Sequence, residues 1–177
     1  DLNIGAAPVI TGQPSNLTVC ANTNAVFSVV ATVAPTPAPY QWQVSTDGGG
    51  TYADVVNGAV YSGAASATLT LTGTPVAFNG NRYRCNLSSS CGSATSNSVL
   101  LTVNALPAIT AQPSNATLCV GSNNTFSVTA TGTGITYQWQ ISASGCAGPW
   151  NDILGATSSG YTLNAITAGQ NNTGYRC

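Results

Sequence analysis

The chain contains one sequence module written twice, and this internal repeat limits the folds that it can adopt. The sequence YQWQ occupies residues 40–43 and returns at residues 137–140, and Cys20 returns 99 positions later as Cys119. A period of about one hundred residues is too long for a solenoid repeat and corresponds to a small domain. The repeat therefore predicts two tandem domains.

Alternation of apolar and polar residues in short runs predicts β-strands, and no segment shows a helical period. In the first copy these runs lie at residues 25–31, 40–44, 67–71, 82–87 and 99–103. In each copy a central-strand tryptophan is followed by a tyrosine two positions before a cysteine, which is typical of immunoglobulin-type sandwiches. We therefore predict an all-β chain of two tandem immunoglobulin-like β-sandwich domains. The predicted core residues are Trp42, Trp139, Tyr83, Tyr175, Phe27 and Phe126.

The domain boundaries follow from the repeat and from Pro107 at its joint. We expect an N-terminal extension at residues 1–7, a first domain at 8–104 and a second domain at 105–177. The second copy stops at Cys177, where the first copy continues into a last apolar strand, so the second domain is expected to lack that strand. Either a longer chain supplies it, or a neighbouring molecule does, with residues 1–10 as the candidate donor strand.

Charged residues are too few for a nucleic-acid interface. The 177 residues include three basic residues, four acidic residues and no histidine. Nucleic-acid binding requires a basic cluster that neutralises phosphates, and membrane insertion requires a far longer apolar run than any present here. We therefore expect no nucleic-acid partner and no membrane insertion. A surface of small polar residues with little net charge favours association with other molecules.

The short sequences QPSN, VCA, FSV, YQWQ, STDGG, YRC and TSNS extend over nearly the whole chain. Together they resemble the Ig-like repeats of large secreted and cell-surface proteins of Bacteroidetes-type bacteria. This resemblance implies the type of domain and leaves its role open, because such repeats serve as spacers, adhesins and fibre subunits.

Six cysteines in a chain without histidine favour disulfides in an oxidising compartment over a metal site. Val29 and Val128 occupy the position that usually carries the first cysteine of the immunoglobulin bridge. We therefore expect that bridge to be absent from both domains.

Other pairings of the cysteines remain open. Cys20 and Cys119 precede the strand that would carry the usual cysteine, near the sandwich edge where the Tyr-x-Cys strand begins. The predicted bonds are Cys20–Cys85 and Cys119–Cys177, with Cys20–Cys91 as the alternative to the first. Cys91 and Cys146 have no equivalent in the other copy, and we assign them to local bonds or to bonds between subunits.

The sequence offers no set of residues for catalysis. Without histidine, Ser-His-Asp and Cys-His mechanisms are excluded, and we predict no enzyme. Asp47 precedes glycine in a turn, and with Asp54 it would form only a weak calcium site, so we expect no metal and no cofactor. Trp150, Tyr52 and Tyr61 are candidates for stacking on sugars, although the alignment of Trp150 with Tyr52 indicates a structural position at a sheet edge.

The sequence favours a non-enzymatic structural module of an extracellular fibre or a cell-surface adhesin, built from Ig-like domains joined end to end. The linker at residues 104–106 is too short for free swivelling, which predicts a semi-rigid rod. The alternative function is a carbohydrate- or ligand-binding accessory module of a larger secreted protein. The expected partners are other copies of the chain, further Ig-like domains, or a cell-surface or polysaccharide ligand. We expect the protein to be exported from bacteria to the cell surface or the extracellular space.

Overall fold

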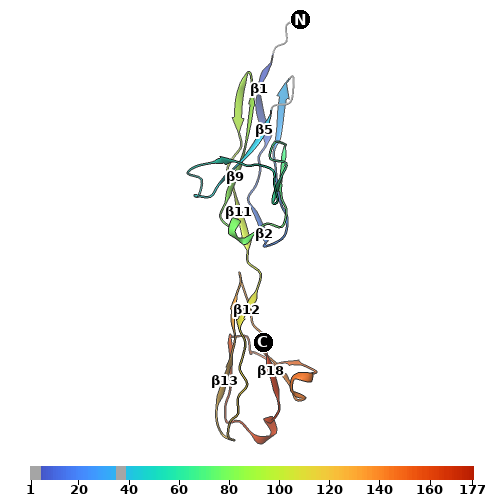
Figure 1. Cartoon of the computed structure of the whole chain (residues 1–177), viewed down its shortest axis with the longest axis vertical. Coiled ribbons are helices and arrows are strands. Elements are labelled where there is room, and N and C mark those ends of the chain that lie inside the picture. Colours follow the sequence, from blue (N-terminus) through green and yellow to red (C-terminus); the bar gives the residue numbers. More distant parts are fainter. Residues whose placement is uncertain (1–4, 35–38) are drawn as a thin grey trace. The chain divides into compact units, whose positions relative to one another are not determined.

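The computed structural model of this chain describes residues 5–34 and 39–177, which divide into two compact units. Unit 1 comprises residues 1–105 and unit 2 comprises residues 106–177 (Figure 1). Apart from three single-turn 3-10 helices, the regular elements of these described residues are β-strands. The fold is therefore all-β, with two tandem immunoglobulin-like sandwiches, as the sequence predicts.

One sheet of unit 1 has the strand order β2-β11-β9-β5-β6, and β10 pairs with the remaining length of β9. Its strands are β2 (Leu17–Cys20), β11 (Val99–Asn104), β9 (Arg82–Ser89), β5 (Tyr40–Ser45), β6 (Ala53–Asp54) and β10 (Gly92–Thr95). Neighbouring strands are antiparallel, except that β2 and β11 run parallel. The chain therefore leaves unit 1 along a strand that lies beside one of its first strands.

The opposite layer of unit 1 consists of two short sheets. They contain β1 (Ala6–Gly12) paired with β4 (Val30–Ala34), and β8 (Thr68–Leu71) between β3 (Ala25–Ser28) and β7 (Tyr61–Ser62). The sequence predicts one strand over residues 25–31, but the structure divides it at Val29, because the chain changes its partner there from β8 to β1. A 3-10 turn, η1 (Val76–Phe78), precedes β9.

Residues 6–10 of the candidate donor strand at residues 1–10 belong to β1, which is paired within unit 1. Ala6 lies opposite Ala34 and Ile10 lies opposite Ala31. Residues 1–4 lie outside the described residues. A donor role for the N-terminal segment therefore stays a prediction.

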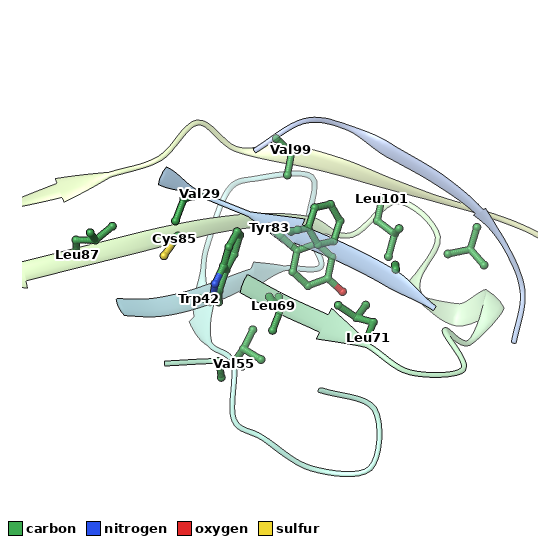
Figure 2. Close-up of a cluster of buried hydrophobic side chains, with 14 of the residues drawn as sticks. Val29, Trp42, Val55, Leu69, Leu71, Tyr83, Cys85, Leu87, Val99 and Leu101 are labelled. Atoms are coloured by element: carbon green, nitrogen blue, oxygen red, sulfur yellow. The ribbon is translucent and has the colours of Figure 1, made fainter. Parts of the chain in front are cut away.

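The core of unit 1 lies between the two layers (Figure 2). The side chains of Trp42, Tyr83 and Leu69 are fully buried. The ring of Phe27 stacks on that of Tyr83 with centroids 5.0 Å apart and lies 6.3 Å from that of Trp42. The indole Nε1 of Trp42 donates to the carbonyl oxygen of Ser66 at 2.9 Å, so this large side chain is buried without an unpaired polar atom.

Unit 2 repeats much of this arrangement. Its paired strands are β12 (Ala108–Ala111) with β14 (Thr129–Thr131), β13 (Asn124–Ser127) with β17 (Gly160–Leu163), and β15 (Gln140–Ser142) with both β16 (Asn151–Asp152) and β18 (Gly174–Arg176). Its 3-10 turns are η2 (Gly145–Ala147) and η3 (Ala168–Gln170). Trp139 is fully buried, and its Nε1 donates to the carbonyl oxygen of Ser158 at 2.9 Å.

The described residues of unit 2 contain no strand equivalent to β2 or β11. Phe126 and Tyr175 stack with ring centroids 5.0 Å apart, yet both are only half-buried. Leu118 and Val120, in the segment that corresponds to β2 and its following residue, are 45% and 71% exposed. The core of unit 2 is therefore more exposed on this side than that of unit 1, where Phe27 and Tyr83 are buried.

The buried face of β8 gives a direct test of this core. We expect Leu69→Ala to lower the free energy of unfolding by about 2–5 kcal/mol, because it removes buried methyl groups and leaves a cavity. Val26→Ala, on the outer face of neighbouring β3, is the matched control and should change it by less than about 0.5 kcal/mol. Urea unfolding of the full chain, followed by circular dichroism, measures both. Equal effects of the two substitutions would contradict the described burial of Leu69 and exposure of Val26.

Candidate functional site

A row of hydrogen-bonded side chains crosses the outer face of unit 1 from β6 through β5 to β9. The Nε2 of Gln43 donates to Asp54 Oδ1 at 2.7 Å, and its Oε1 accepts from Arg84 Nε at 2.8 Å. The strand register pairs Gln43 with both residues, and the alternation of side chains along a strand directs all three away from the buried Trp42. The guanidinium of Arg84 lies 3.8 Å from the centroid of the Tyr52 ring.

The same row occurs in unit 2. Gln140 Nε2 donates to Asp152 Oδ1 at 2.7 Å, and Gln140 Oε1 accepts from Arg176 Nε at 2.7 Å. The guanidinium of Arg176 lies 4.4 Å from the ring centroid of Trp150. We term Asp54, Gln43, Arg84 and Tyr52 the unit 1 row, and Asp152, Gln140, Arg176 and Trp150 the unit 2 row.

Each row holds its polar atoms in place and leaves part of their bonding capacity unused. Within the described residues, the hydrogen bonds of the two arginines run through Nε alone, and those of Asp54 and Asp152 run through Oδ1 alone. Among residues 5–34 and 39–177, the terminal guanidinium nitrogens and the second carboxylate oxygens have no hydrogen-bond partner. Each row therefore presents fixed donors and fixed acceptors to the solvent.

The residue beside the aromatic ring differs between the rows. In unit 1, the segment at Gly49 lies against both Tyr52 and the side chain of Arg82. In unit 2 the position of Arg82 is taken by Gly174, where an added Cβ would lie 2.9 Å from the Trp150 ring and 2.5 Å from the carbonyl oxygen of Gly145. The larger ring of unit 2 is therefore combined with the smallest residue beneath it.

The turn at Asp47 is a closed hydrogen-bonded loop. The carboxylate accepts from the hydroxyl of Ser45 at 2.6 Å and from the hydroxyl of Thr51 at 2.7 Å, as well as from backbone N–H groups. These bonds, led by that of Ser45, hold the pKa of Asp47 well below its usual range. Both oxygens of this carboxylate already accept hydrogen bonds within the turn, so its role is to stabilise the turn.

Cys85 points into the core beside Val29 (Figure 2). Burial raises the pKa of its thiol to about 11, so the thiol is protonated at neutral pH and is a poor nucleophile. The position opposite Cys85 is thus occupied by valine, which excludes the usual immunoglobulin bridge in unit 1, as the sequence predicts.

The predicted bond between Cys20 and Cys85 does not fit the structure, in which all six cysteines are free thiols. Cys20 is exposed and lies opposite Asn104, whereas Val99 lies opposite Tyr83, two residues before Cys85. The two cysteines are therefore separated by more than the length of β11, about 16 Å. A disulfide requires Cα atoms within about 7 Å.

The other cysteine predictions differ in outcome: Cys119 and Cys177 are unbonded in the structure, and the bond between them stays a prediction. Cys91 lies in the turn between β9 and β10, beyond Cys85 along β9 and therefore still farther from Cys20. The alternative bond between Cys20 and Cys91 does not fit either. Cys119 and Cys146 are exposed and Cys177 is half-buried. Bonds of Cys91 and Cys146 to other molecules stay a prediction.

No metal centre or membrane span is found in the part of the chain that the structure describes. No group of three or more potential metal ligands lies together in residues 5–34 and 39–177. None of the helices in this part has the length and hydrophobicity that a membrane span requires.

The sequence alone did not identify these rows. Their members are separated by up to 41 positions in unit 1, and the two-residue strands β6 and β16 are too short for a detectable alternation. A signal was nevertheless present, because the repeat places the same glutamine, aspartate and arginine in both copies, with tyrosine and tryptophan as the aromatic pair.

Comparisons with known sequences match both halves of the chain. A family model described as "Domain of unknown function (DUF8696)" matches residues 10–105 and again residues 108–177. Endoglucanase C of Cellulomonas fimi is 34% identical over 158 residues, which are 88% of this chain and 13% of the endoglucanase. The chain therefore spans only a small part of that relative.

Solved structures resemble the chain in fold at lower identity. The structure of DIP-gamma IG1+IG2 is 14% identical with a TM-score of 0.63, and the match covers 93% of this chain and 86% of that chain. The N-terminal four Ig domains of Dscam1 isoform 9.44 are 16% identical with a TM-score of 0.58, over 97% of this chain and 44% of that chain. These similarities show the immunoglobulin-like fold.

The close approach at Gly174 predicts a specific defect in unit 2. Gly174→Ala should lower the free energy of unfolding by about 1–3 kcal/mol, because the new methyl group meets the Trp150 ring and a backbone oxygen. Gly160→Ala is the matched control, since a Cβ there has only ordinary contacts of 3.5 Å or more. Acrylamide quenching of tryptophan fluorescence should increase in Gly174→Ala alone, as Trp150 is displaced into solvent. Unchanged quenching and stability would contradict the described packing.

Proposed function

Because the chain belongs to the family described as "Domain of unknown function (DUF8696)" and carries two copies of its domain, we propose that it is a non-catalytic structural module of a larger extracellular protein. In this role it connects and spaces other parts of a fibre or a cell-surface adhesin. The immunoglobulin-like fold suits this role, because its interior is filled by packed side chains and the domain therefore keeps a fixed form. The small number of charged residues also suits close association with neighbouring molecules.

The parallel pairing of β2 with β11 is the observation that carries this proposal. β2 follows the first strand of unit 1, and β11 is the strand by which the chain leaves that unit. Four residues of β2 lie in register with residues 101–104. The N–H of Ala21 extends the pairing by donating to the carbonyl oxygen of Asn104 at 2.8 Å.

This pairing suits a domain that is held under tension. A force that pulls the two ends of unit 1 apart acts on β2 and β11 in opposite directions along their length. Because parallel strands are joined by evenly spaced bonds, their hydrogen bonds are then loaded together. A hairpin pulled from its open end would instead lose its bonds one after another. The arrangement therefore supports a role in transmitting tension.

The match to Endoglucanase C is consistent with an accessory position in a larger protein. The similar region is 13% of that endoglucanase, which leaves most of its length for the activity in its name. We propose that the present chain is likewise one part of a larger protein and that any catalytic activity belongs to another part.

Force spectroscopy tests the structural role. Ala21→Pro removes the N–H that bonds to Asn104, and Val29→Pro removes an N–H that donates to Ala67 in the opposite layer at 3.0 Å. Each substitution should lower the free energy of unfolding by at least about 1 kcal/mol. When the chain is pulled from its ends, the unfolding force of unit 1 should fall clearly in Ala21→Pro and much less in Val29→Pro.

Two results would contradict the proposal. The first is an equal loss of unfolding force in both variants, because resistance would then follow overall stability and not the β2–β11 pair. The second is unfolding of the unsubstituted unit 1 at a force no higher than that of a simple hairpin.

A further inference from the structure

The two rows contain most of the charged groups of this chain. Of its three basic and four acidic residues, Arg84, Asp54, Arg176 and Asp152 lie in the rows. Exposed charge pairs add little to stability, often less than about 1 kcal/mol. A structural need therefore accounts poorly for the use of scarce charges at the same place in both units. We propose that each row is a binding surface for a neutral polysaccharide.

The free atoms of the rows match the groups of such a ligand. A sugar hydroxyl both donates and accepts hydrogen bonds. Each row offers terminal guanidinium nitrogens as donors and one free carboxylate oxygen as acceptor, while the central glutamine holds both side chains in position through Nε and Oδ1. Because this bonding pattern forms without the ligand, little side-chain entropy is lost on binding.

The charge of the rows indicates a neutral ligand. Each row combines one arginine with one aspartate, so its net charge is zero. An acidic polysaccharide would be attracted by the arginine and repelled by the aspartate. A basic peptide would be attracted by the aspartate and repelled by the arginine. Tyr52 and Trp150 add half-buried aromatic rings at one end of the two rows, and such rings present apolar area with a polar tip.

The shape of the rows indicates an extended polymer. Each row crosses three adjacent strands, a distance of about 10 Å between its outer members, on an outer sheet face. A short stretch of a linear polysaccharide can lie along such a row without entering a cavity. Since a polymer offers many equivalent positions, two rows in one chain also raise the apparent affinity when both engage. This inference does not depend on the proposed tension-bearing role, because binding needs neither β2 nor β11.

Affinity electrophoresis of the full chain in gels with a soluble neutral polysaccharide tests the inference. Hydroxyethyl cellulose, glucomannan and xylan serve as neutral probes, and polygalacturonate serves as the acidic one. Combined Gln43→Ala and Gln140→Ala should weaken the retardation by a neutral probe at least about tenfold, since both rows lose their central residue. The matched control combines Gln13→Ala and Gln170→Ala, which remove one glutamine from each unit outside the rows, each of them a side chain that accepts a backbone N–H.

Tryptophan fluorescence reports on the unit 2 row directly. Trp42 and Trp139 are fully buried, so acrylamide quenches mainly Trp150, and a bound neutral polysaccharide should protect it. Combined Asp54→Asn and Asp152→Asn keeps the acceptor for each glutamine and replaces the free oxygen by a donor. This variant should fold like the unsubstituted chain by circular dichroism, yet bind more weakly.

Three outcomes would overturn the inference. The first is that no neutral probe retards the unsubstituted chain. The second is that the control glutamine substitutions weaken retardation as strongly as the row substitutions. The third is stronger retardation by polygalacturonate than by every neutral probe.

Discussion

The buried tryptophan of each unit is the interaction on which the rest of the structure depends. Trp42 packs against the opposite layer, and its polar groups bond to the segment between β6 and β8. Its backbone N–H donates to the carbonyl oxygen of Ala64, and its carbonyl oxygen accepts from the N–H of Val55. Its indole Nε1 donates to the carbonyl oxygen of Ser66. Trp139 makes the equivalent bonds to Ala156, Ile153 and Ser158. Since these bonds hold the segment that follows β6 against β5, they also bring Asp54 beside Gln43.

The sequence predicted the fold where the signal is local. Alternation along the chain revealed β5, β8, β9 and β11, and the repeated tryptophan and Tyr-x-Cys identified the sandwich. It did not predict the parallel pairing of β2 with β11, which joins residues more than 80 positions apart. The predicted Cys20–Cys85 bond does not fit because the sequence does not reveal the register between strands. In the structure, Cys20 and Cys85 lie near opposite ends of β11.

The candidate site was harder to predict than the core, because its members are polar and come from three strands. A core position is indicated by its apolar side chain, whereas Gln43 and Arg84 resemble any exposed residue until the register sets them side by side. Comparison of the two copies supplies evidence that these polar residues form a set, which a single copy does not give. The same donor and acceptor types recur in unit 2 although the aromatic residue, the preceding turn and the exposure of the core all differ.

Gly174 and Trp150 in unit 2 stand where unit 1 has Arg82 and Tyr52, which links the residue types at two positions that are far apart in the sequence. The ring comes from the segment before β6 or β16, and the second residue comes from the start of β9 or β18, so in unit 2 the ring of Trp150 leaves room only for glycine at position 174. A recombination point between these two segments would join a large ring to a large neighbour, or leave a void.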